Sequence, residues 1–236
     1  MTDIRANTVL AAKRRPVTLH TADELSLEGE LAVPVLADPT ATAVCLHPLP
    51  THGGSLDSHL LRKMAWRLPA LADMAVLRFN TRGTGASQGS YDAGGAERLD
   101  VAAALDLVEA ESLPAPWLVG WSFGSELALM YGAADPSVVG AVLLAPPLKR
   151  AGDEDLQQWA QSGKPLVAIV PEFDDYLRPD AAAARFSVVP QSVVVPVLRS
   201  KHLFVGFAEE VLDEIVRFIT PDHFPLPTSW TPKEPT

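Results

Sequence analysis

The chain has 236 residues, of which 47% are hydrophobic and 20% charged, so it is long enough to fold as one domain with a substantial core. Its 29 acidic and 19 basic side chains give a formal net charge of −10, which argues against nucleic acid or an anionic membrane surface as the main partner. Since Cys45 is the single cysteine and no apolar run has the length of a signal peptide or a membrane span, we expect a cytoplasmic protein without disulfides.

The first predicted elements are two antiparallel strands at the edge of a sheet. Residues 17–20 and 25–33 carry partly alternating apolar side chains, and the second run ends at Pro34. We expect residues 1–15 to form an N-terminal extension in front of this strand pair.

Beyond Pro34, short apolar runs alternate with helical stretches. The runs are nearly continuous, as strands covered on both faces require; they span residues 41–46, 74–79, 117–120, 138–144, 166–170 and 193–198. Apolar residues recur at helical spacing within 56–68, 101–108 and 212–219, and a short helix fits around 155–161. This alternation predicts an α/β fold with a mostly parallel sheet, helices on both faces and no lid domain. Cys45, inside the first of these runs, is expected to be a buried strand residue.

The sequence Gly120-Trp121-Ser122-Phe123-Gly124 joins a predicted strand to a helical segment, 126–134. A Gly-x-Ser-x-Gly at such a junction predicts a nucleophile elbow, in which a tight turn presents the serine hydroxyl. Glycine avoids the collisions that a Cβ would cause in this turn, and the following helix N-terminus favours a developing negative charge. Ser122 is therefore the candidate nucleophile.

A serine nucleophile needs a general base and a group that orients this base. On this kind of sheet, both follow the serine in the order acid, then histidine, each in a loop after a strand. Three carboxylates, those of Glu172, Asp174 and Asp175, occupy the loop after the penultimate strand, and each is a candidate acid. His202 lies between the last strand and the final helix, which makes it the candidate base.

An oxyanion hole requires two N–H donors. The residue after the nucleophile, Phe123, supplies the first. The second is expected in the loop 47–54, where the prolines cannot donate and Leu49 is the natural donor. The two histidines of this loop, His47 and His52, lack a third ligand at convincing spacing, so we expect no metal.

Two further motifs carry a resemblance to a known family. Residues His47–Gly54 read His-Pro-x-Pro-x-x-Gly-Gly, and Arg82–Ser87 read Arg-Gly-x-Gly-x-Ser. With the elbow, they resemble the compact lidless bacterial members of the α/β-hydrolase superfamily over roughly residues 17–220. The resemblance places the acid three residues after a strand-end glycine; Pro171 stands there in this chain, and counting from it indicates Asp174.

The resemblance implies hydrolysis of an ester, thioester or amide of a small acyl substrate through an acyl-enzyme, without a cofactor. His202 would deprotonate Ser122, and Asp174 would fix the imidazole tautomer. Trp121 and Phe204 are candidates for an apolar acyl pocket, with packing in the core as the equal alternative. In place of the acidic residue that often precedes the family's histidine, this chain has Lys201.

Other functions and the domain limits complete these expectations. The alternatives to a hydrolase are a catalytically silent scaffold that acts as a binding protein and an acyltransferase. A dinucleotide site is rejected, because Gly83, Gly85 and Gly89 do not have the Gly-x-Gly-x-x-Gly spacing.

We expect the domain to span residues 16–220 and residues 221–236 to form a proline-rich tail that is extended and partly disordered.

Overall fold

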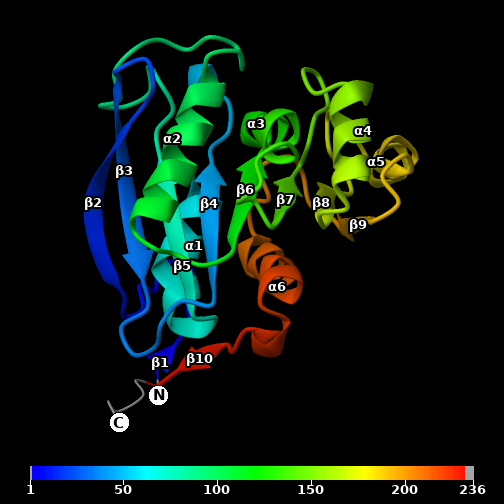
Figure 1. Ribbon diagram of the computed structural model, residues 1–236. Coiled ribbons are helices and arrows are strands. Elements are labelled where there is room, and N and C mark those ends of the chain that lie inside the picture. Colours follow the sequence, from blue (N-terminus) through cyan, green and yellow to red (C-terminus); the bar gives the residue numbers. More distant parts are fainter. Residues whose placement is uncertain (1, 232–236) are drawn as a thin grey trace.

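The structure, a computed structural model, describes residues 2–231 and is built on one large sheet covered by helices on both faces (Figure 1). Its strands are β2 (Lys13–His20), β3 (Ser26–Val33), β4 (Ala41–Leu46), β5 (Met74–Phe79), β6 (Pro116–Trp121), β7 (Gly140–Leu144), β8 (Leu166–Pro171) and β9 (Ser192–Val197). They are arranged in the order β2-β3-β5-β4-β6-β7-β8-β9. β2 pairs antiparallel with β3, and β3 with β5, whereas all pairs from β5 to β9 are parallel.

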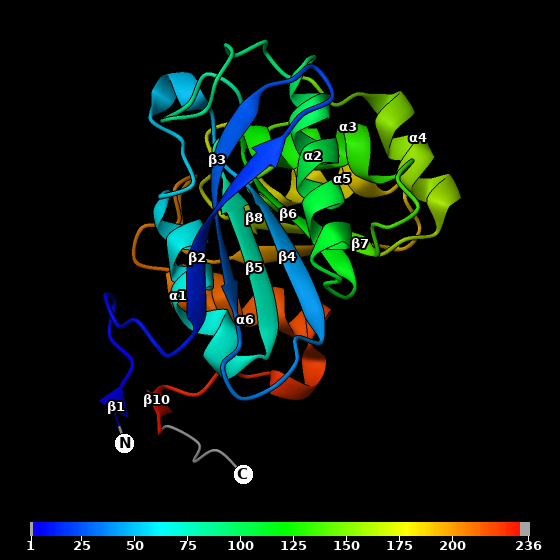
Figure 2. The ribbon, with the colours of Figure 1, turned by 60° about the vertical axis from the view of Figure 1, so that its left-hand side comes forward.

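The helices of the described residues divide between the two faces. They are α1 (His59–Leu71), α2 (Glu97–Ala110), α3 (Phe123–Gly132), α4 (Asp153–Ser162), α5 (Pro179–Phe186) and α6 (Ala208–Ile219), with 3-10 turns η1 (Pro50–His52) and η2 (Pro221–His223). Apolar side chains of α2 to α5 form one core cluster, and those of α1 and α6 form the other. Figure 2 shows α1 and α2 on either side of β4 and β5. The predicted α/β fold with an antiparallel N-terminal pair is confirmed.

Burial along the strands explains the apolar patterns in the sequence. Every residue of β4 to β8 is buried, because helices cover these strands on both faces. The outer strands β2 and β9 expose many of their side chains. Cys45 lies in β4 with no exposed surface, and burial raises the pKa of its thiol to about 12, as expected for an inert strand residue.

Two features of the helical layer bear on the predictions. The connection between β7 and β8 holds α4 and loops only, so the predicted absence of a lid agrees with the described residues. Helix α5 is absent from the sequence predictions. It starts at a proline and buries only Ala182 and Phe186, so its apolar pattern is too short to reveal a periodicity.

The first and last strands of the described residues lie beside the amino ends of the parallel strands (Figure 1). Strand β1 (Thr2–Asp3) pairs antiparallel with β10 (Ser229–Trp230). Within the predicted tail, the described residues form the turn η2 and the strand β10, while Pro232 and Pro235 lie outside the described residues, so the expectation that the tail is partly disordered stays a prediction. Strand β2 also begins within the predicted extension. Within residues 2–231, none of the helices has the length and apolar character that crossing a membrane requires.

Candidate active site

Ser122 lies at the sharp turn between β6 and α3, where its backbone adopts φ 51° and ψ −111°. A positive φ is unfavourable for a residue with a Cβ and commonly marks a functional position. A Cβ at Gly120 would lie 2.2 Å from the carbonyl oxygen of Gly124, and one at Gly124 would lie 2.0 Å from that of Leu46. Both glycines are therefore required by close backbone contacts, as the elbow motif predicts.

Three side chains from separate loops meet at the carboxyl ends of the parallel strands. The Nε2 atom of His202 lies 2.9 Å from the Oγ atom of Ser122, and its Nδ1 atom lies 2.8 Å from Oδ2 of Asp174. The Asp174 side chain is only 1% exposed. Its Oδ1 accepts the N–H groups of Tyr176 at 2.7 Å and Leu177 at 3.1 Å. One carboxylate oxygen thus orients the imidazole while the other is held by the backbone.

The structure distinguishes the three carboxylates of the loop after β8. Asp174 alone contacts His202, whereas Asp175 is exposed. Glu172 accepts the backbone N–H of Arg199 at 2.6 Å and so connects this loop to the one that carries His202. The geometry favours Asp174, the residue indicated by counting from Pro171.

The two predicted oxyanion donors lie in the segments that follow two neighbouring strands: Leu49 follows β4, and Phe123 follows β6. The Phe123 N–H is the first of α3, where no carbonyl of the same helix accepts it. The carbonyl of Leu49 accepts the N–H groups of His52 and Gly54, both at 3.0 Å, which folds the loop 47–54 back on itself. Among residues 2–231, no hydrogen bond uses the N–H of Leu49 or Phe123, so both remain available to a ligand.

His47 fixes the start of this loop. It is fully buried, donates from Nδ1 to the carbonyl of Pro48 at 2.6 Å, and accepts at Nε2 from the Thr81 N–H and hydroxyl at 3.1 and 3.0 Å. Burial lowers the pKa of His47 to about 4, although the hydrogen bond to Pro48 opposes this shift. A neutral imidazole thus ties the loop to the end of β5. His52 is exposed, and no group of three or more metal-ligating side chains occurs in the part of the chain that the structure describes.

The Arg-Gly-x-Gly-x-Ser turn has a structural role. Arg82 donates from Nε to Oδ1 of the buried Asp100 at 2.9 Å and from its guanidinium to Asp23, also at 2.9 Å. The hydrogen bond from Arg82 lowers the pKa of Asp23 to about 2. Ser87 accepts the N–H of Glu28 at 2.9 Å. These bonds attach the turn to α2 and to the β2–β3 pair, behind the active-site loops.

Trp121 and Phe204 are buried, so of the two alternatives, an acyl pocket and packing in the core, their positions agree with the core. Trp121 is 2% exposed and Phe204 has no exposed surface, and both belong to the core under α1 and α6. The Trp121 indole donates to the carbonyl of His202 at 3.3 Å. Trp121 ends a strand that is covered on both faces, so its side chain enters the core and supports the His202 loop from below.

Two aromatic residues, His59 and Tyr176, support the His202 loop in a way that no motif in the sequence predicts. The Nε2 atom of His59 donates to the Leu203 carbonyl at 2.7 Å, and its ring packs edge-on against Trp121. Burial lowers the pKa of His59. The ring of Tyr176 packs edge-on against His202, with centroids 4.6 Å apart. Because 144 positions separate His59 from Leu203, periodicity and local motifs do not reveal this contact.

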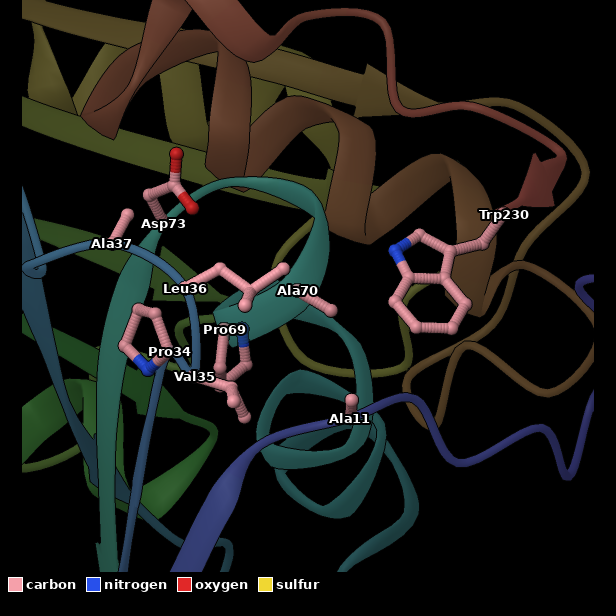
Figure 3. A pocket seen from close by; sticks show the side chains of 9 residues that line it. All are labelled: Ala11, Pro34, Val35, Leu36, Ala37, Pro69, Ala70, Asp73 and Trp230. Carbon is pink, nitrogen blue, oxygen red and sulfur yellow. The ribbon is translucent and has the colours of Figure 1, made fainter. Parts of the chain in front are cut away.

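The described residues form hollows at both ends of the sheet. A groove of about 340 Å³ adjoins the oxyanion loop; it is lined by Pro50, Thr51, Gly53, Gly54, Ser55, Gly83, Thr84, Gly85 and Tyr91. A smaller pocket of about 70 Å³ lies near the chain ends, where Val35 and Leu36 face Pro69 and Ala70 of α1 (Figure 3).

Comparison with known proteins gives results that agree with this geometry. A family model described as "Alpha/beta hydrolase family" matches residues 43–233. An uncharacterized protein of Rickettsia prowazekii is 32% identical over 108 residues. The matched segment spans 45% of this chain and 45% of that relative, which is less than half of each.

Several solved structures share the fold over nearly their whole length. An alpha-beta serine hydrolase homologue from Coxiella burnetii has a TM-score of 0.75 and 27% identity, covering 86% of this chain and 96% of that one. A serine hydrolase without a lid from Xanthomonas campestris has a TM-score of 0.75 and 26% identity, covering 91% and 99%. An esterase from Pyrococcus furiosus, 17% identical, covers 92% and 96% with a TM-score of 0.74 and so shares the fold.

Proposed function

The chain belongs to the alpha/beta hydrolase family, and we propose on this premise that it is a serine hydrolase acting on a carboxylic ester, thioester or amide of a small substrate. The observation that carries the proposal is the continuous hydrogen-bonded series Ser122–His202–Asp174, with distances of 2.9 and 2.8 Å. A hydroxyl at hydrogen-bond distance from an oriented imidazole is the arrangement that nucleophilic catalysis requires.

In the proposed acylation step, the Ser122 oxygen attacks the substrate carbonyl carbon while its proton passes to Nε2 of His202. The carbonyl π electrons move to oxygen, and the N–H groups of Leu49 and Phe123 donate to this oxyanion. Asp174 stabilises the imidazolium ion. Collapse of the tetrahedral intermediate expels the alcohol, thiol or amine, which takes the proton from His202 and leaves an acyl group on Ser122.

Deacylation repeats these steps with water as the nucleophile. His202 removes a proton from water as the hydroxide oxygen attacks the acyl carbon, and the same two N–H groups hold the second oxyanion. The proton then returns to the Ser122 oxygen when the carboxylic acid leaves. Strain at Ser122 and the buried carboxylate of Asp174 are maintained by the fold, so the site is organised before substrate binds.

Labelling with a fluorophosphonate tests this proposal, because such a probe phosphonylates an activated serine. We expect wild-type protein to be labelled and to hydrolyse p-nitrophenyl acetate. Ser122→Ala should abolish both, and the exposed control Asp175→Asn should retain both. Labelling that persists in Ser122→Ala would show that another residue is the nucleophile. A wild-type protein that neither reacts nor hydrolyses any ester tested would favour a silent scaffold.

A further inference from the structure

A buried carboxylate of α3 fixes the loop after β7 beside the proposed triad. Glu126 has no exposed surface, and its Oε1 accepts the backbone N–H groups of Lys149 and Arg150. Its Oε2 accepts from the Arg150 guanidinium at 2.9 Å. Burying a carboxylate is unfavourable unless it is paired and hydrogen-bonded, so these contacts hold the loop in one conformation. The positive φ of Leu148, 47°, shows how tightly the chain turns here.

The two adjacent cations of this loop differ in their contacts. Arg150 uses its donors within the fold: besides Glu126, it donates to the Ala93 carbonyl and to the Tyr91 hydroxyl, each at 2.9 Å. Its guanidinium also lies 5.1 Å from the centroid of the Phe123 ring. Arg150 therefore serves to neutralise the buried carboxylate and to brace the start of α3.

Lys149 is exposed, and its ammonium group contacts the ring of Tyr176. Its Nζ atom lies 4.1 Å from the ring centroid of Tyr176, and the same ring packs edge-on against His202 with 4.6 Å between the ring centroids. No salt bridge joins Lys149 to a carboxylate of residues 2–231. One aromatic ring thus separates a free ammonium group from the imidazole of the triad.

The position of the Lys149 ammonium group suits it to bind part of a substrate. A cation–π contact restricts the lysine side chain but leaves its N–H donors free for a further partner. The ammonium group carries one positive charge and three N–H donors, so it can donate to a carboxylate oxygen and neutralise its single negative charge. Building on the proposed hydrolase function, we propose that the substrate carries a carboxylate group near its scissile bond and that the Lys149 ammonium binds it.

The test compares matched esters with and without the carboxylate. For the acyl side, the pair is 4-nitrophenyl hemisuccinate and 4-nitrophenyl butyrate; for the alcohol side, it is 4-acetoxybenzoate and its methyl ester. The measured quantity is the ratio of kcat/KM for the anionic ester to that for its neutral partner. In at least one pair, we expect Lys149→Gln to lower this ratio about fivefold, mainly through KM, and Lys149→Glu to lower it further, since an exposed ion pair contributes about 1 kcal/mol. Lys149→Arg should restore the ratio. The ester pair whose ratio changes shows whether the carboxylate lies on the acyl side or on the alcohol side of the scissile bond.

Two control variants separate binding at Lys149 from a general effect of charge. Lys13→Gln removes an exposed cation at the opposite end of the sheet, and Lys201→Gln removes the exposed cation next to His202. The proposal is overturned if Lys149→Gln leaves both ratios within about twofold, or if either control lowers them equally. Ser122→Ala measured on the neutral esters tests the hydrolase function separately, because turnover that survives this substitution contradicts the mechanism whatever the ratios show.

Discussion

Each end of the sheet carries a histidine paired with an aspartate, but the two pairs have different surroundings. At the carboxyl ends of the parallel strands, His202 and Asp174 are 2.8 Å apart, the carboxylate is buried, and a strained serine lies beside the ring. At the amino ends, His223 and Asp73 are 3.3 Å apart and both side chains are partly exposed. The pocket near Asp73 is lined mainly by apolar side chains (Figure 3).

The difference shows that neither a His–Asp pair nor a hollow identifies an active site by itself. What distinguishes the first pair is the combination of backbone strain at Ser122, a desolvated carboxylate and two unused N–H groups. Each of these features destabilises a fold unless other contacts offset it, so their occurrence in one place favours function over packing.

The largest effect is expected from His202→Ala. Removing the proposed general base should lower kcat/KM for a p-nitrophenyl ester by about 10⁴- to 10⁶-fold. The matched variant His223→Ala should change it by less than about twofold, because within residues 2–231 the Nε2 atom of that imidazole contacts Asp73 and its Nδ1 atom has no hydrogen-bond partner. Steady-state kinetics of both purified variants give the two values of kcat/KM. Comparable losses in the two variants would mean that the His202–Asp174 pair has no special role in catalysis.

The carboxylates provide the next test. Asp174→Asn should lower kcat by about 10³- to 10⁴-fold, because an amide no longer holds the imidazole in the required tautomer or stabilises its cation. Asp73→Asn and Asp175→Asn should leave kcat nearly unchanged. A larger loss in Asp175→Asn than in Asp174→Asn would show that the orienting acid is assigned to the wrong residue.

Acid should destabilise the fold through His47. Its pKa is about 4 in the folded protein against an ordinary value of 6.5, so below pH 6.5 the unfolded chain binds a proton that the folded chain excludes. Stability from this group is complete above pH 6.5 and decreases by about 3 kcal/mol as the pH falls toward 4. Urea unfolding at several pH values should give a shallower dependence for His47→Gln than for wild type; identical slopes would mean that His47 is not buried as a neutral ring.

The smallest effect is expected at the apolar pocket of the amino end. Trp230→Ala removes a partly buried indole and should lower the free energy of unfolding by about 1–2 kcal/mol. Since this pocket is remote from the triad, kcat/KM should remain within about twofold. Thermal unfolding and ester hydrolysis measured on the same sample check both statements, and a marked loss of activity would give this end of the sheet a role in function.

The sequence was sufficient to predict the parts of the site that depend on local patterns. The glycines of the elbow and the order of Ser122 and His202 along the chain reflect steric and topological rules that apply wherever this fold occurs. The choice among the carboxylates was not determined by the loop residues, because burial and the N–H groups of Tyr176 and Leu177 decide which one faces the imidazole.

Other features depend on contacts between distant segments. His59 and Glu126 contact loops far along the chain, and no spacing in the sequence reports such contacts. The position of Trp121 has a related cause. Helices cover its strand on both faces, so the side chain packs in the core although it is next to Ser122, and the strand pattern alone left the core and an acyl pocket as equal alternatives.

The pairing of β1 with β10 has a practical consequence for protein engineering. Because Thr2 and Trp230 are paired neighbours at the end of the sheet remote from Ser122, a short linker would join them without crossing the catalytic loops. A circular permutant in which such a linker joins Thr2 to Trp230 would therefore leave the proposed nucleophile accessible.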